Sequence, residues 1–362
     1  MWLFARHPVK HVLPKPYSFT LRSGIHKRPQ NFSTSKCAAT SVKRYSTAQA
    51  APFHLQYGVG PSQLESKAHS LGWNAIQALV EPSFVQHWKF SSEKEKKGFL
   101  ALGFSRAFSQ FFPLTLDERV EVTCKMHYLA LLIDDQLDKM NAADMLSYRE
   151  LIMQIARGKE EPDRSVCVEW MLFDTLQSMR TIDETLANDL VEGFCTLLQM
   201  QTAPERTTIK HLGPYLERRE IDVGRSFYTA LIRFGANLHL SPSELQQTSA
   251  PESTAFRFMG VLNDVYSWDK EWKAYQEHST DGAQPFSAVH VLAQETGLPY
   301  PACKRLMYSY CRELELVLAQ SAAEIRESAG GTLRPEMEKY IKGLEYLMSG
   351  IELWSQWTPR YR

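Results

Sequence analysis

The sequence lacks several features that would place it in common protein classes. No segment approaches the roughly 18 consecutive apolar residues of a membrane span, and the first residues lack the uninterrupted apolar region of a secretory signal. No glycine-rich phosphate loop follows a strand-like segment, so nucleotide-binding folds have no support. The six cysteines form no CxxC pair and no zinc-like spacing with histidines, which indicates reduced thiols. These absences favour a soluble intracellular protein.

Acidic residues are also missing from the N-terminal 64 positions. Residues 1–50 contain nine of the 41 lysines and arginines, which leaves 32 basic against all 41 acidic residues and a net charge of −9 for residues 51–362. This balance gives no support for a nucleic-acid partner. A basic N-terminus rich in serine and threonine is typical of mitochondrial transit peptides, although its prolines weaken the required amphipathic helix. We expect residues 1–54 to form a disordered basic leader and the protein to be mitochondrial or cytoplasmic.

Apolar residues recur with a helical period of about 3.6 from residue 55 onward. No convincing strand alternation, flexible linker or internal repeat interrupts this pattern, and an apolar fraction of 44% is enough for a large core. We therefore expect a single all-α domain over residues 55–362. The predicted helices are 62–80, 92–112, 116–141, 145–157, 164–179, 182–202, 208–235, 242–247, 251–275, 285–296, 299–328 and 332–354.

The segment "LLIDDQLDKM", which begins at Leu131, ends an apolar run with acidic residues. Asp134 and Asp138 are one helical turn apart, on the stripe that also contains Leu131 and Leu137. Burying two carboxylates on this stripe is unfavourable unless a cation or water meets them. The spacing therefore predicts a nearby cation or a wet end of the stripe, although paired acids on a helix more often form a solvated face.

A second polar stripe occurs in "NDVYSWDKE". Asn263, Ser267 and Glu271 recur every four residues, which keeps their oxygen donors within about 80° of one another around a helix. Carboxylate, amide and hydroxyl oxygens are ligands that suit Mg²⁺, which commonly completes its coordination with water and substrate phosphate. The two stripes together predict a cavity with a metal-lined mouth and a diphosphate ligand.

In this order, the two motifs resemble those of class I terpene cyclases of the single-domain fungal and bacterial type. Asp134 to Asp138 match the aspartate-rich DDxxD motif, and Asn263 to Glu271 match the pattern ND-x-x-S-x-x-KE, which includes Lys270. The resemblance implies an all-α fold with a central apolar cavity and three Mg²⁺ ions, for which Mn²⁺ can substitute. The implied metal ligands are Asp134, Asp138, Asn263, Ser267 and Glu271.

Further matches concern the family's diphosphate-binding and effector residues. "RREIDVG" places Arg219 at 44 positions before Asn263, where the family has a diphosphate-sensing arginine, although Arg218 is an adjacent candidate. Asp222 and Val223 then match the linker and the effector that supplies a backbone carbonyl, and Gly224 permits a helix break.

The C-terminal segment "LWSQWTPRYR" matches the family's terminal Arg-Tyr pair and an active-site tryptophan. The resemblance assigns diphosphate binding to Arg219, Lys270, Arg360 and Tyr361, and catalytic roles to Arg219, Asp222, Val223 and Trp354. Aromatic faces attract carbocations, but aromatic residues at helical spacing are more often plain core. Additional candidates for the cavity wall are Phe104, Phe108, Phe111 and Tyr128.

Three functions remain open from the sequence. The first is a cyclase that ionises a linear prenyl diphosphate, favoured as farnesyl diphosphate, and closes the carbocation to a sesquiterpene; geranyl or geranylgeranyl diphosphate would use the same motifs. The second is a chain-elongating prenyl transferase, which would need a second aspartate-rich motif. The third is a non-enzymatic helical protein that binds diphosphates. The expected protein is a monomer or a homodimer, without a nucleic-acid partner.

Overall fold

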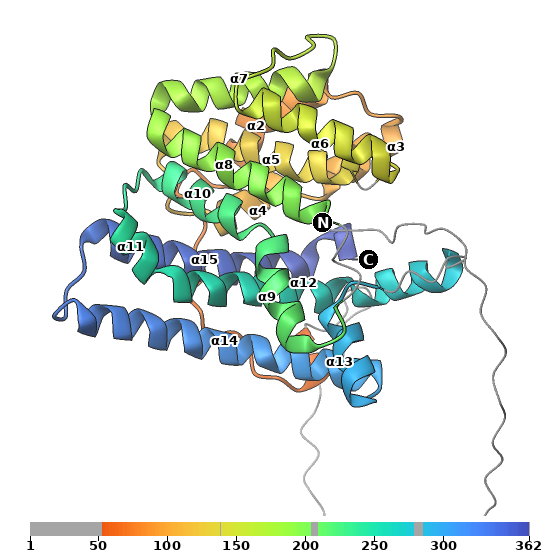
Figure 1. The fold of residues 1–362 in the computed structure, drawn as a ribbon, viewed down its shortest axis with the longest axis vertical. Helices are drawn as coiled ribbons and strands as arrows, with labels where there is room; N and C mark the ends of the chain where they lie inside the picture. The colour runs from red at the N-terminus through yellow and green to blue at the C-terminus, as the bar shows by residue number, and fades with distance from the viewer. Residues whose placement is uncertain (1–52, 138, 204–208, 279–284, 362) are drawn as a thin grey trace, which may run out of the picture.

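The computed structural model describes residues 53–137, 139–203, 209–278 and 285–361. Within these ranges the chain forms α-helices and short 3-10 helices and no strand, which confirms the expected all-α fold (Figure 1). The helices are α1 (Phe53–Tyr57), α2 (Trp73–His87), α3 (Glu93–Ala101), α4 (Phe104–Phe111), η1 (Asp117–Arg119), α5 (Val120–Leu137), α6 (Ala142–Ala156), α7 (Cys167–Ile182), α8 (Glu184–Gln201), α9 (Leu212–Asp222), α10 (Arg225–Ala236), α11 (Pro242–Gln247), α12 (Ser249–His278), α13 (Ala288–Thr296), α14 (Tyr300–Ser328), α15 (Pro335–Trp357) and η3 (Pro359–Tyr361).

Two predicted helices are each divided by a glycine in a left-handed conformation. The expected helix 92–112 ends at Ala101 and resumes as α4, because Gly103 has a φ of 63°. The expected helix 208–235 likewise divides into α9 and α10 at Gly224, whose φ is 100°. The second break was anticipated from the glycine itself, whereas the first was not.

The predicted helix 62–80 was wrong in its first half. Helix α2 begins only at Trp73, after Gly72 at a φ of 74°. The residues before it form an extended segment along α14 and α15, where the backbone N–H of Gln63 donates to Glu315 at 3.0 Å and that of Glu65 to Glu345 at 3.3 Å. Contacts far away in the chain therefore replace the local helical hydrogen bonds.

The two helices with the predicted metal-binding motifs lie inside the bundle. Helix α5 packs against α2 and α7, and α12 packs against α9, α14 and α15. In Figure 1, α6, α7 and α8 occupy the upper part of the molecule, and α12, α14 and α15 occupy the lower part. Helix α15 also packs against α4, so the C-terminal segment is brought next to both halves.

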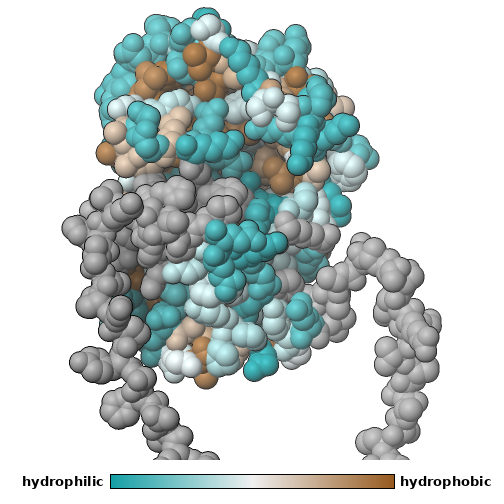
Figure 2. Space-filling model, turned by 90° about the vertical axis from the view of Figure 1, so that its right-hand side faces the viewer, coloured by the Kyte–Doolittle hydropathy of each residue, from teal (hydrophilic) through white to brown (hydrophobic). Residues whose placement is uncertain are grey.

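The described surface contains few features of its own. Figure 2 shows a face on which hydrophilic residues dominate outside the grey atoms, with separate brown groups in the upper part. Across the described helices, none combines the length and apolarity that crossing a membrane requires. The cysteines in the described ranges are free thiols: Cys124, Cys167, Cys195, Cys303 and Cys311. The predicted leader, residues 1–54, lies almost entirely outside the described residues, since α1 begins at Phe53.

Candidate active site

The acidic end of α5 meets the C-terminus of the chain. Asp134 is buried, while the Asp135 side chain is 30% exposed and accepts a hydrogen bond from Arg360 Nη2 at 3.0 Å. Burial lowers the pKa of Arg360, but the charges of Asp135 and then Asp134 outweigh it and hold that pKa above its usual value. The cation that a buried Asp134 requires is therefore Arg360. Asp138, the other predicted acid, lies outside the described residues.

The predicted ligands on α12 are Asn263, Ser267 and Glu271, in the middle of this helix. Asn263 and Ser267 are buried, and Asn263 Nδ2 donates to the Tyr361 hydroxyl at 2.8 Å. Glu271 keeps part of its side chain exposed, but the packing around its carboxyl group, followed by the charge of Asp264, raises its pKa to about 7. A carboxyl group with a raised pKa lacks an adequate cation partner, which a bound divalent cation would supply.

Ser267 gives a separate test of whether the site fits a metal ion. Its buried Oγ forms no hydrogen bond of normal length and angle with the described residues, although it lies near enough to Glu271 to lower that group's pKa. A buried hydroxyl oxygen beside an amide oxygen and a carboxylate is a donor set for a hard cation such as Mg²⁺. The described residues hold no cluster of three or more His, Cys, Asp or Glu side chains, because this set mixes residue types and is divided between α5 and α12.

Arg219 lies across α12 and contacts the same motif. Its Nη2 donates to Asn263 Oδ1 and to Asp264 Oδ1, each at 2.8 Å, and its Nη1 donates to Asp222 Oδ2 at 2.9 Å. Burial alone would lower the pKa of Arg219, but the adjacent carboxylates raise it. The close approach requires Gly260, since a Cβ there would lie 2.7 Å from Arg219 Cγ.

The alternative arginine points elsewhere. Arg218 Nη2 donates to the Met200 carbonyl at the end of α8, at 2.9 Å. Only Arg219 therefore reaches the α12 motif. Asp222 is fully buried at the last position of α9, and Val223 follows as the C-cap residue before Gly224. The backbone carbonyl expected from Val223 thus lies at the break between α9 and α10.

The C-terminal residues join the two motifs. Arg360 contacts Asp135 on α5, whereas Tyr361 contacts Asn263 on α12, and both belong to the single turn η3. Lys270 Nζ donates to the Arg360 carbonyl at 2.8 Å and so holds this turn against α12. The structure therefore brings together the predicted residues of α5, α9, α12 and η3.

Aromatic residues extend below this polar mouth. The Trp354 ring lies 5.7 Å from Tyr361, 6.0 Å from Phe111 and 6.5 Å from Phe104, between ring centroids. The Trp354 Nε1 donates to the Leu102 carbonyl at 3.1 Å, which fixes the plane of the indole. Tyr128 instead stacks on Phe84 of α2, with a centroid distance of 5.0 Å.

Two residues of the site were not assigned roles from the sequence. Asp135 lies one position off the apolar stripe, and its partner is 225 positions away in the chain. Asp264 accepts hydrogen bonds from Arg219, from the Tyr215 hydroxyl at 2.6 Å and from the Ala288 N–H at 2.9 Å. It therefore joins α9 and α13 to α12. The only sequence signal for Asp264 was its place in the second motif.

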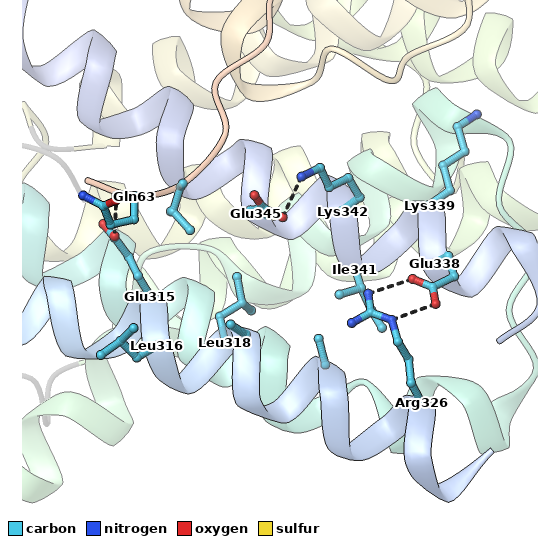
Figure 3. Close-up of a pocket in the computed structure, with 13 residues that line it drawn as sticks. Gln63, Glu315, Leu316, Leu318, Arg326, Glu338, Lys339, Ile341, Lys342 and Glu345 are labelled. Carbon is cyan, nitrogen blue, oxygen red and sulfur yellow. Dashed lines mark hydrogen bonds and ion pairs between the residues drawn. The ribbon is translucent and has the colours of Figure 1, made fainter. Parts of the chain in front are cut away.

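A separate groove of 610 Å³ lies between α14 and α15 and includes Gln63 and Leu64 (Figure 3). Its charged side chains are largely paired with one another, as in Arg326 with Glu338 at 2.8 Å and Lys342 with Glu345 at 2.9 Å. None of the predicted site residues lines it. The groove is thus distinct from the polar mouth.

The sequence and the fold can now be compared with those of known proteins. Residues 125–315 match the family described as terpene synthase family 2, C-terminal metal binding. The chain is 38% identical to the aristolochene synthase of Aspergillus terreus, over 83% of this chain and 93% of that protein. It is 41% identical to the aristolochene synthase of Penicillium roqueforti, over 79% and 83% of the two chains.

The fold agrees with these relationships. The crystal structure of aristolochene synthase from Penicillium roqueforti superposes with a TM-score of 0.73 at 39% identity, and covers 82% of this chain and 98% of that one. The family match includes both α5 from Lys125 onward and all of α12. The chain therefore belongs to the terpene synthase family and is a class I terpene cyclase.

Proposed function

We propose that this enzyme ionises farnesyl diphosphate, cyclises the resulting carbocation to a sesquiterpene and releases diphosphate. The observation that most directly supports this proposal is the position of η3, whose Arg360 contacts α5 and whose Tyr361 contacts α12. The two groups of oxygen donors consequently face one mouth, and cationic and hydroxyl donors lie between them. The relatives named as aristolochene synthases support a fifteen-carbon substrate.

The proposed metal ligands are Asp134 on α5 and the oxygen donors of α12, with Asp138 as a further ligand outside the described residues. On α12 these are Asn263, Ser267 and Glu271. Mg²⁺, in three ions by analogy with the family and replaceable by Mn²⁺, would stabilise the charge that develops on the departing diphosphate.

The proposed diphosphate-binding groups are Arg219, Lys270, Arg360 and Tyr361. Arg219 and Arg360 are buried and held by carboxylates, so both are fixed before substrate arrives. Donors that are fixed in advance stabilise developing negative charge without a reorganisation cost at the moment of reaction. Because Arg219 also bonds Asp222, a shift of its guanidinium toward diphosphate would be transmitted to the break at Val223 and Gly224.

The hydrocarbon part of the substrate would lie against the aromatic residues below the mouth. Trp354 and its neighbours Phe104 and Phe111 present faces that attract carbocations, at about 0.5–2 kcal/mol each, and no nucleophile. The same rings exclude water, which would otherwise quench the cation early.

We further propose that the enzyme acts as a monomer or a homodimer and that residues 1–54 are a leader separate from the catalytic domain at 55–362. The acid-free composition of this leader supports a mitochondrial or a cytoplasmic location. Light scattering of the purified protein would give the oligomeric state.

The substrate is tested by incubating the purified protein with Mg²⁺ and, in separate reactions, with the ten-, fifteen- and twenty-carbon prenyl diphosphates. We expect cyclic hydrocarbons by gas chromatography and mass spectrometry from the fifteen-carbon substrate, and none in excess chelator. Turnover confined to the ten- or twenty-carbon substrate would contradict the proposed chain length. Release of diphosphate without any hydrocarbon product would contradict cyclisation.

A further inference from the structure

Helix α5 contains a buried histidine that none of the roles above uses. His127 is 1% exposed, and neither of its ring nitrogens has a hydrogen-bond partner among the described residues. Buried polar groups in native proteins are almost always paired, so an imidazole that lacks both hydrogen bonds calls for an explanation. His69 shows the usual arrangement: it is equally buried, but its Nε2 lies 2.7 Å from the Thr115 carbonyl and its Nδ1 accepts from the Leu71 N–H at 3.2 Å.

The surroundings of His127 are entirely aromatic at short range. Five rings have centroids between 5.6 and 6.3 Å from the imidazole centroid: Phe104, Phe108, Phe111, Phe112 and Tyr228. Phe104 and Phe111 are also the neighbours of Trp354. The imidazole therefore belongs to the same aromatic wall as the tryptophan that faces the hydrocarbon.

The position of His127 relative to the mouth follows from the helix. His127 precedes Asp134 by seven residues, so the two lie on the same face of α5 and about 10 Å apart along its axis. Tyr228 lies between them: its pKa is raised by burial and then by the charge of Asp134, and its ring is 5.9 Å from His127. The imidazole consequently lies deep in the apolar part of the site, away from the diphosphate end.

We propose, on the basis of the cyclase function above, that His127 is the base that removes a proton from a carbocation during formation of the sesquiterpene. The C–H bond next to the cationic carbon breaks, and its electron pair forms the C=C bond of the alkene. The proton passes to a free ring nitrogen of His127. The imidazolium then loses this proton to water when the product leaves and the site opens.

The chemistry of the site suits this role. Burial lowers the pKa of His127 to about 3, so the imidazole is neutral and has a free lone pair when the substrate binds. A carbocation with an adjacent C–H bond is a far stronger acid than an imidazolium, even one with this lowered pKa. The surrounding aromatic faces would also stabilise the imidazolium while it lasts.

The test compares two substitutions at His127 with a matched control. His127→Asn keeps a polar group of similar reach that cannot accept the proton, and His127→Leu replaces the imidazole by an apolar side chain. His69→Asn makes the first change at the buried histidine that already has hydrogen bonds. For each variant, diphosphate release and the product distribution are measured with farnesyl diphosphate and Mg²⁺.

We expect both His127 variants to release diphosphate at the wild-type rate, because ionisation takes place at the mouth. Proton removal should slow by about 10²–10⁴-fold, so the main alkene should give way to alcohols and to other alkene isomers. His69→Asn should keep the wild-type product distribution. His127→Leu should be at least as thermally stable as the wild type, since it removes a buried polar group without partners.

Three outcomes would overturn the inference. The wild-type product distribution in His127→Leu would exclude a role in proton removal while leaving the cyclase function intact. Unfolding of both His127 variants at the assay temperature would show that the imidazole is a structural part of the core. Absence of any hydrocarbon from the wild-type enzyme would instead reject the cyclase function and, with it, this role for His127.

Discussion

Arg360 Nη2 lies 3.0 Å from Asp135 Oδ1 and joins the last turn of the described chain to the acidic end of α5. The adjacent Tyr361 reaches α12 through Asn263, so one short turn fixes the distance between the two motifs. This arrangement makes the C-terminus part of the site and suggests that its residues act at the ionisation step.

Arg360→Ala should slow turnover by about 10²–10³-fold, because losing one fixed donor to developing negative charge typically has this effect. The product distribution should be largely retained, since the guanidinium lies at the mouth. Steady-state kinetics and product analysis would measure both. Arg334→Ala, which removes an exposed arginine paired with Glu244, is the control and should leave both unchanged. Scrambled products from Arg360→Ala at an undiminished rate would contradict the assignment.

Trp354→Ala should change the products more than the rate. Removing the indole takes away a cation–π face of about 2 kcal/mol and opens space for water, so early-terminated or hydroxylated products should increase. Trp354→Phe keeps an aromatic face but loses the hydrogen bond to Leu102, and should stay nearer to the wild-type distribution. An unchanged distribution in Trp354→Ala would show that this ring does not face the cation.

Gly260→Ala should impair the site without altering any charged group. The new methyl carbon would lie 2.7 Å from Arg219 Cγ, so the guanidinium must move away from Asn263 and Asp264. We expect a loss of turnover comparable to that from one lost donor, about 10²-fold. Gly98→Ala is a helical control with nothing within 4 Å of the added carbon, and should preserve activity while stabilising α3 by up to about 1 kcal/mol. Equal activity of both variants would mean that the position of Arg219 is not critical.

Removing divalent metal ions with excess chelator should abolish turnover, and adding Mg²⁺ or Mn²⁺ should restore it. Asn263→Ala should lower activity by about 10²–10³-fold with the helical circular dichroism unchanged, because a proposed ligand is lost from an otherwise intact helix. Full activity in the chelator would refute the metal site.

Deleting residues 1–50 should leave thermal stability and turnover unchanged, since this segment has neither a helical period nor a motif of its own. Fusing the same residues to a fluorescent reporter would distinguish the two proposed locations. Diffuse cytosolic fluorescence would exclude mitochondrial targeting, and an inactive truncated enzyme would show that the segment takes part in the site.

The local pattern of the sequence was enough to predict most helices and the composition of the site. A period of 3.6 residues is a property of each segment alone, and four-residue spacing placed Asn263, Ser267 and Glu271 on one face of α12 without knowledge of any other helix. The break at Gly224 was likewise predicted from the residue itself. The helix predicted over 62–80 failed because residues 63 and 65 bond to side chains more than 250 positions away.

The tertiary structure alone decided which neighbours in the sequence share the site. Arg218 and Arg219 differ by one position, about 100° around a helix, and only the packing of α9 on Gly260 of α12 turns Arg219 toward Asn263. In the same way, Asp135 gains a role only because Arg360 returns from the far end of the chain. His127 resembles any core residue until its five aromatic neighbours, drawn from three segments, leave its nitrogens without partners. Local periodicity fixes which face a residue occupies on its own helix, whereas the partner on the facing helix depends on contacts that no short segment encodes.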